Sequence, residues 1–436
     1  MMEYLKRAPS PSNESDIRIR QTVETMLADI EQNGEAAVLR YASDLDNWAG
    51  DVILSDEKRL KLIKEVPEQI CQDISFAYHQ IKTFAEAQRD SLQEFEIETE
   101  PGVRLGQRVI PVNCAGCYVP GGRYAHIASA LMSITTAKVA GVPLVITCSP
   151  PHDGSIHPAI AFAMNLAGAD IILQLGGAHG VAAMAFGLFT GHETDIIVGP
   201  GNSYVAEAKR ILFGRVGIDV FAGPTESAII ADDTADPMTI AIDLISQAEH
   251  GPDSPVWLFT TSNEIGARVA EIIPKVAADM PNEDVIMKAW RDFGEIVFCP
   301  SREKIVEISD RYAPEHLQVI AKDLEWWKNQ LRNYGSLFLG EGSTVTHGDK
   351  CSGTNHILPT KRAGRYTGGL NVHKFLKTLT YQELDSAANE KFSAVSSRIS
   401  RAEGMEGHAR ACDWRLRKYF PDKDWDFEVN LQQRYD

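Results

Sequence analysis

Residues 131–180 read LMSITTAKVAGVPLVITCSPPHDGSIHPAIAFAMNLAGADIILQLGGAHG and place short apolar runs between longer segments of helical character. The apolar runs are Val142–Thr147 and Asp170–Leu175, and the helical segments Leu131–Gly141 and His157–Gly168 both end in glycine. Glycine often terminates a helix, and short apolar strands that alternate with helices are typical of βαβ units. This stretch therefore predicts an α/β fold with a mainly parallel sheet.

The same alternation extends on both sides of this stretch. Further strands are predicted at Val109–Val119, Asp195–Val198, Ser227–Ala231, Val256–Thr260, Glu295–Cys299 and Ser336–Gly340, and further helices at Val181–Gly187 and Val205–Gly214. A chain of 436 residues is too long for one ordinary core, so we expect at least two α/β substructures.

The two ends of the chain are predicted to be helical. Ser12–Gly34 has apolar residues at helical spacing and a terminating glycine, and Asp56–Leu92 is a charged helical stretch. After about Gly368 the strand signals fade, and Tyr381–Arg417 is predicted to be helical and charged. We expect this tail to act as a docking arm without a core of its own.

The formal net charge of -17 argues against nucleic acid or an anionic membrane as the main partner, although a local cationic pocket for a small anion is not excluded. Met1–Arg20 lacks the apolar segment of a signal peptide, and no apolar run has the length of a membrane span. Seven scattered cysteines suit a reducing compartment, so we expect a cytoplasmic protein. Cys114 and Cys117 lie in a predicted strand without a second pair, which favours packed thiols over zinc.

Glycine-containing turns follow several predicted strands, at Pro120–Gly122, Gly176–Gly177 and Gly199–Gly201. Taken singly, each is an ordinary strand-to-helix turn; Gly199–Gly201 lacks the third glycine of the dinucleotide fingerprint, and the chain has no P-loop motif. At successive strand ends they should share one edge of a parallel sheet, where free N–H groups at helix starts can hold a phosphate. The pattern predicts a ligand crevice at that edge.

Candidate metal ligands are found in three segments. Gln247 and His250 are three apart on a predicted helix and share a face, although a histidine at a helix end more often bonds solvent or backbone. Further potential metal ligands are Asp349, His356 and His408. Zinc accepts this mixture of nitrogen and oxygen donors, but the spacing alone does not show that they converge.

Ala313–Leu317 (APEHL) contains the most pointed acid–base candidates. Adjacent Glu315 and His316 have different intrinsic pKa values and can act on neighbouring atoms of one substrate. Standing alone, the pair would be interpreted as the end of a strand or a capped helix.

These segments occur together in one known family. The motifs are Tyr118–Gly122 (YVPGG), Ala137–Gly141 (AKVAG), Gly199–Asn202 (GPGN), Gly223–Glu226 (GPTE), Ser246–His250 (SQAEH), Ala313–Leu317 (APEHL), Ser352–Thr360 (SGTNHILPT), and Glu403-Gly404 with His408. In number and order they resemble the histidinol dehydrogenase family, over about residues 15–410.

The resemblance implies a fold and an assembly. It implies two Rossmann-like parallel-sheet domains with small helical arms at both ends, in an intertwined homodimer. The parts would be an N-terminal arm at 1–21, a first α/β domain at 22–117 with 229–366, a second, NAD-binding α/β domain at 118–228, and a C-terminal helical dimerisation arm at 367–436. The arm of one subunit would complete the active site of its neighbour.

The resemblance also implies roles for individual residues. Glu315 would activate water, and His316 would accept and donate the proton. The zinc ligands would be Gln247, His250, Asp349 and His408, and the NAD contacts would be Tyr118, His179 and Asn202. The substrate pocket would comprise Thr225, Gln247, His250, His316, Asp349, His356, Glu403 and His408, with Thr225 in place of the family's usual serine.

The implied cofactors are one Zn²⁺ per subunit and NAD⁺. The implied reaction removes two hydrides from a primary alcohol by way of a bound aldehyde, to which water adds, and ends in a carboxylate. Zinc would position and polarise the substrate as a Lewis acid, while the protein supplies positioning and electrostatics.

Two positions depart from the family's pattern. His179 stands where the family has a glutamine, which puts one NAD contact in question. Thr344-Val345 replaces a Pro-Glu pair four residues before Asp349; that glutamate helps to hold a cationic substrate, and valine removes its charge. Donors suited to an anion occur nearby in Arg123, His126, His347 and Lys350, although each alone would be read as a solvated surface charge.

Together with Gly122–Ser129 and Gly364–Leu370, these departures resemble the sulfopropanediol-oxidising branch of the family. We therefore predict oxidation of 2,3-dihydroxypropane-1-sulfonate to 3-sulfolactate, with Arg123 and His126 among the substrate residues. One alternative is oxidation of L-histidinol to L-histidine in a shifted pocket. Another is a zinc- or nucleotide-binding protein that has lost catalysis, which retention of the Glu-His pair argues against.

Overall fold

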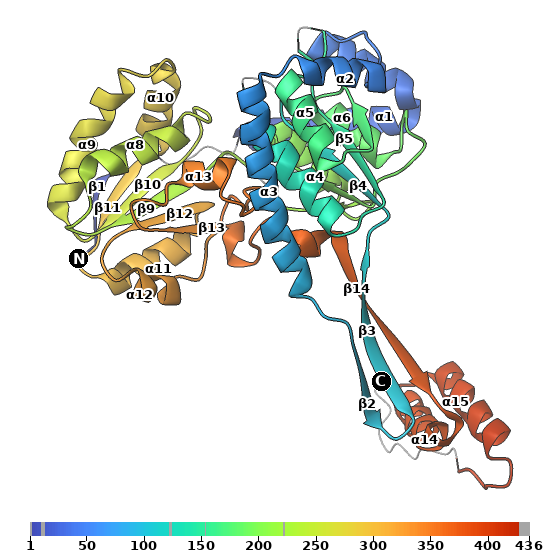
Figure 1. The fold of residues 1–436 in the computed structure, drawn as a ribbon. Coiled ribbons are helices and arrows are strands. Elements are labelled where there is room, and N and C mark those ends of the chain that lie inside the picture. The colour runs from blue at the N-terminus through green and yellow to red at the C-terminus, as the bar shows by residue number, and fades with distance from the viewer. Residues whose placement is uncertain (1, 10–13, 122–123, 153, 221–222, 427–436) are drawn as a thin grey trace. The chain divides into compact units, whose positions relative to one another are not determined.

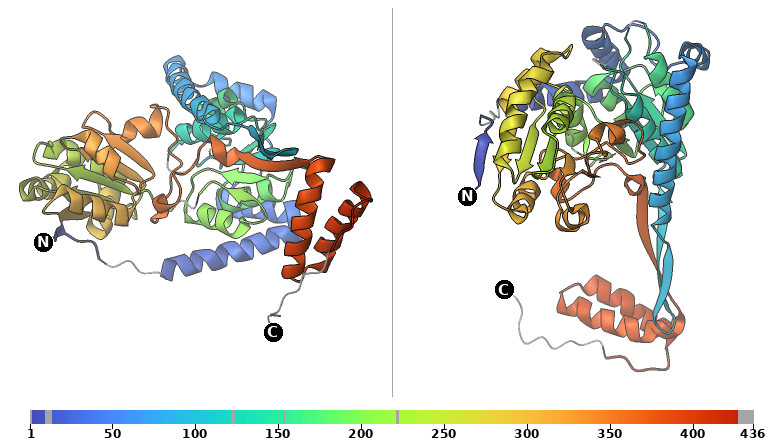
Figure 2. Two further views of the ribbon diagram at one scale, coloured as in Figure 1. Left: turned by 90° about the horizontal axis from the view of Figure 1, so that it is seen from below. Right: turned by 60° about the vertical axis from the view of Figure 1, so that its left-hand side comes forward.

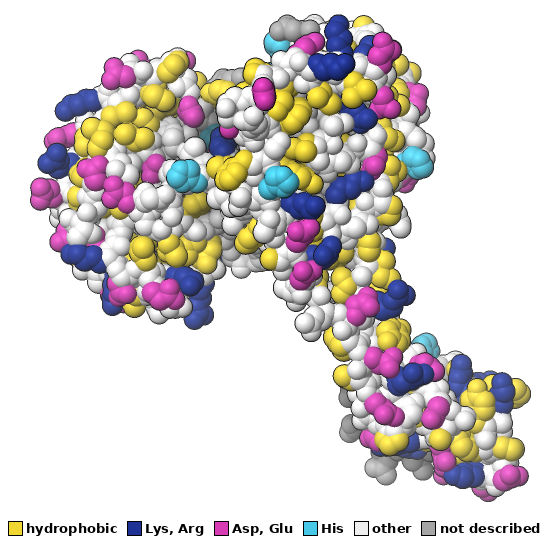
Figure 3. All heavy atoms as spheres, in the orientation of Figure 1, with side chains coloured by type: hydrophobic (Ala, Val, Ile, Leu, Met, Phe, Trp, Pro, Cys, Tyr) yellow, Lys and Arg dark blue, Asp and Glu magenta, His cyan; other side chains and the backbone are white. Residues whose placement is uncertain are grey.

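The computed structural model of the chain describes residues 2–9, 14–121, 124–152, 154–220 and 223–426 (Figure 1). The chain divides into two compact units, Met1–Ser91 with Pro111–Phe375 and Leu92–Ile110 with Leu376–Asp436. No helix among the described residues combines the length and apolarity needed to cross a membrane. On the face drawn in Figure 3, acidic and basic side chains are interspersed.

The first unit contains a five-stranded, wholly parallel sheet with the strand order β6-β5-β4-β7-β8. Its strands are β4 (Cys114–Tyr118), β5 (Leu144–Cys148), β6 (Ile171–Leu173), β7 (Ile196–Val198) and β8 (Gly217–Ile218). From β4 the chain moves outward to β5 and β6, and then returns to the other side of β4 as β7. The direction of winding therefore reverses between β4 and β7, which is where open parallel sheets form their ligand crevices.

Two groups of helices accompany this sheet (Figures 1 and 2). One group is α2 (Asp56–Lys64), α3 (Glu68–Asp90), α4 (Ile127–Val139) and α5 (Pro158–Ala167), and the other is α1 (Glu14–Asp46), α6 (Gly177–Ala185) and α7 (Ser203–Leu212). One helix of each group, α4 or α6, contacts the strands directly. One hydrophobic core joins Val23 and Ile30 of α1 to Ile146, Val181 and Val205. Within 22–117, which we grouped with 229–366, the helix α1 thus shares its core with this sheet, and α2 and α3 pack on α4 and α5.

The helix α1 is interrupted at Gly34, where the sequence predicts its end. Gly34 has φ 58° and ψ -138°, which is not helical, and the chain resumes a second helix directly after it. Glycine tolerates a positive φ that other residues rarely adopt. The predicted stop is thus a kink between two helical segments.

The first unit also contains a six-stranded sheet with the strand order β1-β11-β10-β9-β12-β13. Its strands are β1 (Glu3–Lys6), β9 (Ser227–Ala231), β10 (Val256–Thr260), β11 (Glu295–Phe298), β12 (His316–Ile320) and β13 (Ser336–Leu339). Only the edge strand β1 is antiparallel, so part of the expected N-terminal arm is a strand of this sheet. The α/β class with parallel sheets is confirmed.

The helices of this second sheet pack around two hydrophobic clusters, centred on Ile229, Leu244 and Leu258 and on Ile230, Phe259 and Leu317. The helices are α8 (Pro237–Ala248), α9 (Asn263–Ala277), α10 (Glu283–Phe293), α11 (Arg302–Tyr312), α12 (Leu324–Gln330) and α13 (Val345–Lys350), followed by the short turns η1 (Ala363–Arg365) and η2 (Val372–Phe375). Ile229 and Ile230 are adjacent in β9, and successive strand residues point to opposite faces, so the two clusters lie on opposite faces of the sheet.

The second unit consists of a three-stranded sheet and a helical hairpin. The strands are β2 (Phe95–Glu100), β3 (Val103–Pro111) and β14 (Leu376–Leu384), and the helices α14 (Ser386–Ala402) and α15 (Glu406–Tyr419) lie side by side (Figure 2). The helical part of the expected C-terminal tail is confirmed. The expectation that strands end near Gly368 is wrong, because the exposed β14 pairs with β3, a partner remote in sequence.

Candidate active site

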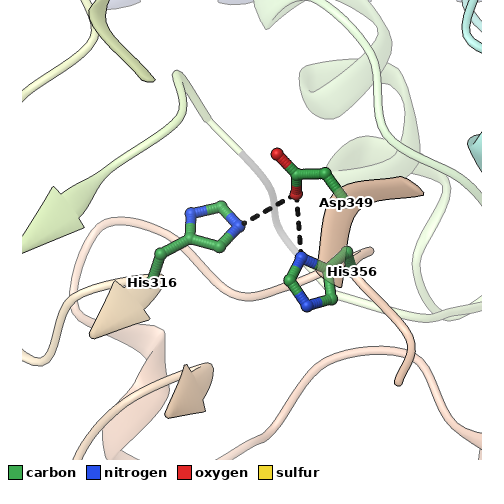
Figure 4. A group of neighbouring side chains, drawn as sticks. All are labelled: His316, Asp349 and His356. Atoms are coloured by element: carbon green, nitrogen blue, oxygen red, sulfur yellow. Dashed lines mark hydrogen bonds and ion pairs between the residues drawn. The ribbon is translucent and has the colours of Figure 1, made fainter. Parts of the chain in front are cut away.

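His316, Asp349 and His356 form a group in which one potential ligand atom from each lies within 4.8 Å of the others (Figure 4). His316 is the first residue of β12, Asp349 lies in α13, and His356 follows α13 in an irregular segment. His356 Nδ1 is 2.8 Å from Asp349 Oδ1, and His316 Nε2 is 3.6 Å from the same oxygen. Both histidine side chains are almost fully buried.

The orientation of His316 is set by the backbone of Glu226. His316 Nδ1 lies 3.0 Å from the carbonyl oxygen of Glu226, which also accepts from the backbone N–H of His316. A carbonyl only accepts, so Nδ1 keeps its proton, and Nε2, which faces Asp349, is the nitrogen that gains or loses the second proton. Burial alone would lower the pKa of His316, but the carboxylates of Glu315 and Asp349 raise it to about 9. The proton that this side chain exchanges is therefore the one on Nε2, and the two carboxylates favour its presence.

The side chain of Glu315 is held by the backbone N–H group of Glu226. Its Oε2 accepts from the backbone N–H of Glu226 at 2.9 Å, and burial raises its pKa to about 8. The same oxygen lies 3.7 Å from His316 Nδ1. A carboxyl and an imidazole whose proton affinities approach each other near neutrality suit acid–base catalysis.

The end of α8 brings further donors to Asp349. Gln247 Nε2 is 3.5 Å from Asp349 Oδ2, whereas its buried Oε1 has no hydrogen-bond partner in the described structure. His250 follows the C-cap of α8, and burial lowers its pKa, which favours the neutral imidazole that binds metals. The buried Nε2 of His356 also lacks a partner among the described residues. These nitrogen and oxygen donors fit the ligand preferences of zinc.

One carboxylate ties together the elements that carry these residues. Asp243, one turn before Gln247 in α8, accepts from Gln318 Nε2 of β12 and from Thr344 Oγ1 at the start of α13, both at 2.9 Å. The positions of His316, Asp349 and the end of α8 are thus coupled through one buried network.

The acid–base pair lies at the amino end of its strand. Glu315 precedes β12 and Glu226 precedes β9, so this part of the site is at the edge of the sheet opposite to the carboxyl ends of its strands.

His126 is the N-cap residue of α4, beside the five-stranded sheet, and it lies close enough to His250, Lys350 and Asp349 for their charges to act on it. Burial is the main cause that lowers its pKa to about 4, with smaller contributions from repulsion by the protonated form of His250 and by the ammonium of Lys350.

The predicted cofactor residues surround the carboxyl ends of β4 and β7. Tyr118 ends β4, and its hydroxyl accepts from the N–H of Gly177 at 3.1 Å. Asn202 caps α7 by accepting from two backbone N–H groups of the first turn. His179 is fully buried, and its Nε2 lies 3.1 Å from Asp46 Oδ2. Its contact is thus with α1 rather than with the open edge of the sheet.

The remaining predicted residues are distributed as follows. Thr225 is half-buried directly before Glu226, while Glu403 and His408 are exposed in α14's cap and α15 of the second unit. Arg123 lies outside the described residues. Of the four predicted zinc ligands, only Asp349 belongs to the compact group, with His316 and His356 as its other members.

Several site residues escaped the sequence prediction. Glu226 is part of the GPTE motif, but its backbone role had no signal in the sequence. Asp46 and Asp243 also went unnoticed, because their partners are remote in sequence. Cys114 and Cys117 are buried, unbridged thiols of β4, which agrees with the prediction of a packed pair.

A buried acid–base pair beside a metal-capable group, in a chain built on two mainly parallel sheets, is the arrangement of an α/β enzyme. The family profile described as histidinol dehydrogenase matches residues 10–416. The chain belongs to the histidinol dehydrogenase family. It is thus an NAD-dependent dehydrogenase that acts on a CH–OH group.

Similar proteins include both branches considered above. A sulfopropanediol 3-dehydrogenase of Ruegeria pomeroyi is 52% identical over 432 residues, covering 98% of this chain and 99% of that protein. A histidinol dehydrogenase homolog of Pelagibacter ubique is 53% identical, covering 95% and 98%. The crystal structure of histidinol dehydrogenase from Elizabethkingia anophelis superposes with a TM-score of 0.87 at 32% identity, covering 94% of each chain.

Proposed function

We propose that this protein carries out a zinc-dependent, NAD-linked, four-electron oxidation of 2,3-dihydroxypropane-1-sulfonate to 3-sulfolactate. Its resemblance to the sulfopropanediol 3-dehydrogenase of Ruegeria pomeroyi supports this substrate. The overall reaction consumes one alcohol, one water and two NAD⁺, and yields one carboxylate, two NADH and three protons.

The charge around α13 is the observation that supports an anionic substrate. Val345, where related histidinol dehydrogenases have a glutamate, is buried and offers no carboxylate to a cationic substrate. Next to Asp349, the ammonium of Lys350 lowers the pKa values of His126, His250 and His356, after the larger effect of burial. The positive charge of Lys350 thus acts on three histidines of the site. This environment favours a sulfonate over an imidazolium.

Gln247, His250 and Asp349 would hold the zinc ion, with His408 supplied by a second copy of the chain. The unpartnered Oε1 of Gln247 and the neutral His250 support this assignment. When bound, zinc supplies a Lewis acid that orients the alcohol and polarises its oxygen. His356, hydrogen-bonded to Asp349, would orient that carboxylate.

NAD⁺ would lie at the carboxyl ends of β4 and β7, against Tyr118, the turn at His179 and Asn202. When bound, it supplies the hydride acceptor for both oxidations. His316 Nε2 takes the proton of the alcohol, while the carbonyl of Glu226 keeps the ring in one tautomer. Glu315 then accepts a proton from the water that adds to the aldehyde, and the resulting hydrate is oxidised to the carboxylate.

A homodimer would complete the site. Glu403 and His408 are exposed on the second unit, whose helices also expose Ile399 and Trp414. An exposed apolar face on a small helical unit supports docking to another copy. The arm would therefore bring Glu403 and His408 to its neighbour's substrate and metal.

The test is a substrate panel followed by NADH absorbance. With purified protein, Zn²⁺ and NAD⁺, dihydroxypropanesulfonate should yield two NADH per alcohol, and L-histidinol should yield far less. The reverse preference would assign the protein to L-histidinol oxidation, which the similarity to the Elizabethkingia anophelis structure favours. One NADH per alcohol would contradict the four-electron reaction.

A further inference from the structure

The turn after β7 is held by a buried ion pair that none of the roles above uses. Lys209 Nζ and Asp219 Oδ1 are 2.5 Å apart, and their side chains are 1% and 0% exposed. Lys209 lies in α7, and Asp219 directly follows β8. The two residues therefore meet beneath the turn that joins β7 to α7.

Both charges act on the backbone of one residue of that turn, Gly199. Asp219 Oδ2 accepts from the N–H of Gly199 at 2.8 Å, and Lys209 Nζ donates to its carbonyl oxygen at 2.8 Å. Asp219 Oδ1 also accepts from the N–H of Val220 at 2.7 Å. The donor and the acceptor of Gly199 are thus both fixed by charge-assisted hydrogen bonds, which are stronger than neutral ones.

Gly199 has little freedom to move away from this arrangement. Its φ is +119°, and a Cβ at this position would lie 2.0 Å from the carbonyl oxygen of Tyr118. Tyr118 ends β4 and Gly199 follows β7, so the close contact lies where the winding of the sheet reverses. This is the point at which a dinucleotide would enter.

Stability alone gives a weak reason for such a pair. Removing two ions from water costs several kcal/mol per ion, and well-packed apolar residues often replace a buried ion pair without loss. Lys209 is also not placed as a phosphate ligand, since its buried ammonium is directed to Gly199 and Asp219. The geometry points to a role in holding the shape of the turn.

We propose that Lys209 and Asp219 are positioning residues for NAD, because they hold Gly199 so that the turn and the start of α7 keep the conformation that binds the dinucleotide. This inference rests on the proposed NAD site. It assigns neither residue a contact with the cofactor.

The test compares Lys209→Met, Asp219→Asn and the apolar double variant K209M/D219L in the zinc-loaded enzyme. The Kd of NAD⁺ is measured by tryptophan fluorescence, and kcat and both KM values by NADH formation. We expect Kd and KM for NAD to rise by on the order of tenfold to a hundredfold, with KM for the alcohol within about twofold of wild type. The double variant should regain the Tm lost in Lys209→Met without regaining NAD affinity.

Lys138→Met is the matched control. Lys138 pairs with Asp170 at 2.5 Å, and Asp170 also accepts from the N–H of Val145, but this pair lies at the amino end of the same sheet. Its KM for NAD should match wild type.

Wild-type NAD affinity in the folded double variant, or an equal rise in both KM values, would overturn the inference. If the double variant does not fold, the same criteria apply to Asp219→Asn, which keeps the side-chain shape. Failure of the wild-type protein to bind NAD⁺ would instead overturn the proposed function on which the inference rests.

Discussion

Val345 stands one helical turn before Asp349 in α13, on the same face, and its side chain is 2% exposed. A side chain at position 345 therefore faces the buried surroundings of the metal-capable group. The family resemblance implies a glutamate here in histidinol dehydrogenases, whose negative charge an imidazole-bearing substrate would neutralise. Valine leaves that charge out, and under the proposed function we expect the same environment to accept an anion.

Val345→Glu should therefore lower activity on the sulfonate. A carboxylate at this buried position repels both Asp349 and the anionic substrate, so we expect kcat/KM for dihydroxypropanesulfonate to fall by about tenfold or more. Initial rates of NADH formation measure the change. Val345→Gln, which has nearly the same shape without the charge, is the control and should lose less. Equal losses in the two variants would mean that volume, not charge, sets the preference.

Glu315→Gln should separate the two oxidation steps. The amide keeps the shape of the side chain but cannot accept the proton of water, so aldehyde hydration should slow by about 10²–10⁴-fold. In a rapid-quench single turnover we expect one NADH per subunit in the fast phase, where wild type gives two. The exposed Glu303→Gln in α11 serves as control. Two NADH formed at the wild-type rate would show that another group activates the water.

The regular part of the fold could be predicted because its signal is local. The runs around β5, β6 and β10 are apolar and end in turns, and each pattern is complete within a few residues. The strand β12 had no such signal: its sequence HLQVI contains two polar residues, and its identity comes from pairing with β9 and β13. Exposed β14 likewise depends on a remote partner.

The site shows the same division between local and long-range information. Glu315 and His316 stood out because they are adjacent, whereas the hydrogen bond between His356 and Asp349 depends on the path of the intervening loop. His179 was identified as a departure from the family, but its partner Asp46 lies 133 residues earlier in the chain. Contacts of this kind arise from packing, which no spacing rule in a single sequence reveals.

The stability of the protein should depend on pH through Glu226. Burial raises the pKa of this carboxyl from 4.5 to about 7, so the folded state binds its proton more tightly than the unfolded chain. The resulting stability is fully present below pH 4.5 and is lost as the pH rises through 7. Glu226→Gln does not ionise, so its stability relative to wild type should be about 2–3 kcal/mol more favourable at pH 8 than at pH 5. Urea denaturation at both pH values, at one Zn²⁺ concentration, measures this difference. An unchanged difference would mean that Glu226 is charged in the folded protein throughout this range.

Gly348→Ala should weaken the metal site without altering any candidate ligand. A Cβ at position 348 would lie 2.2 Å from Nε2 and Cε1 of His356 and 2.8 Å from Cε1 of Phe338. The buried imidazole has little room to retreat, so we expect it to lose its hydrogen bond to Asp349. Loss of a partner that orients a metal ligand lowers metal affinity by about 10–100-fold.

The zinc affinity of Gly348→Ala is measured by competition with a chelating dye, and its Tm is recorded with and without Zn²⁺. Gly342→Ala is the matched control, because a Cβ there meets no atom within 4 Å. The control should bind zinc as wild type does, whereas Gly348→Ala should show a smaller rise of Tm on adding Zn²⁺, since the stabilisation by a ligand grows with the logarithm of the ratio of its concentration to its Kd. Wild-type zinc affinity in Gly348→Ala would show that the hydrogen bond between His356 and Asp349 does not contribute to zinc binding. The proposed role of His356 would then be limited to the substrate pocket.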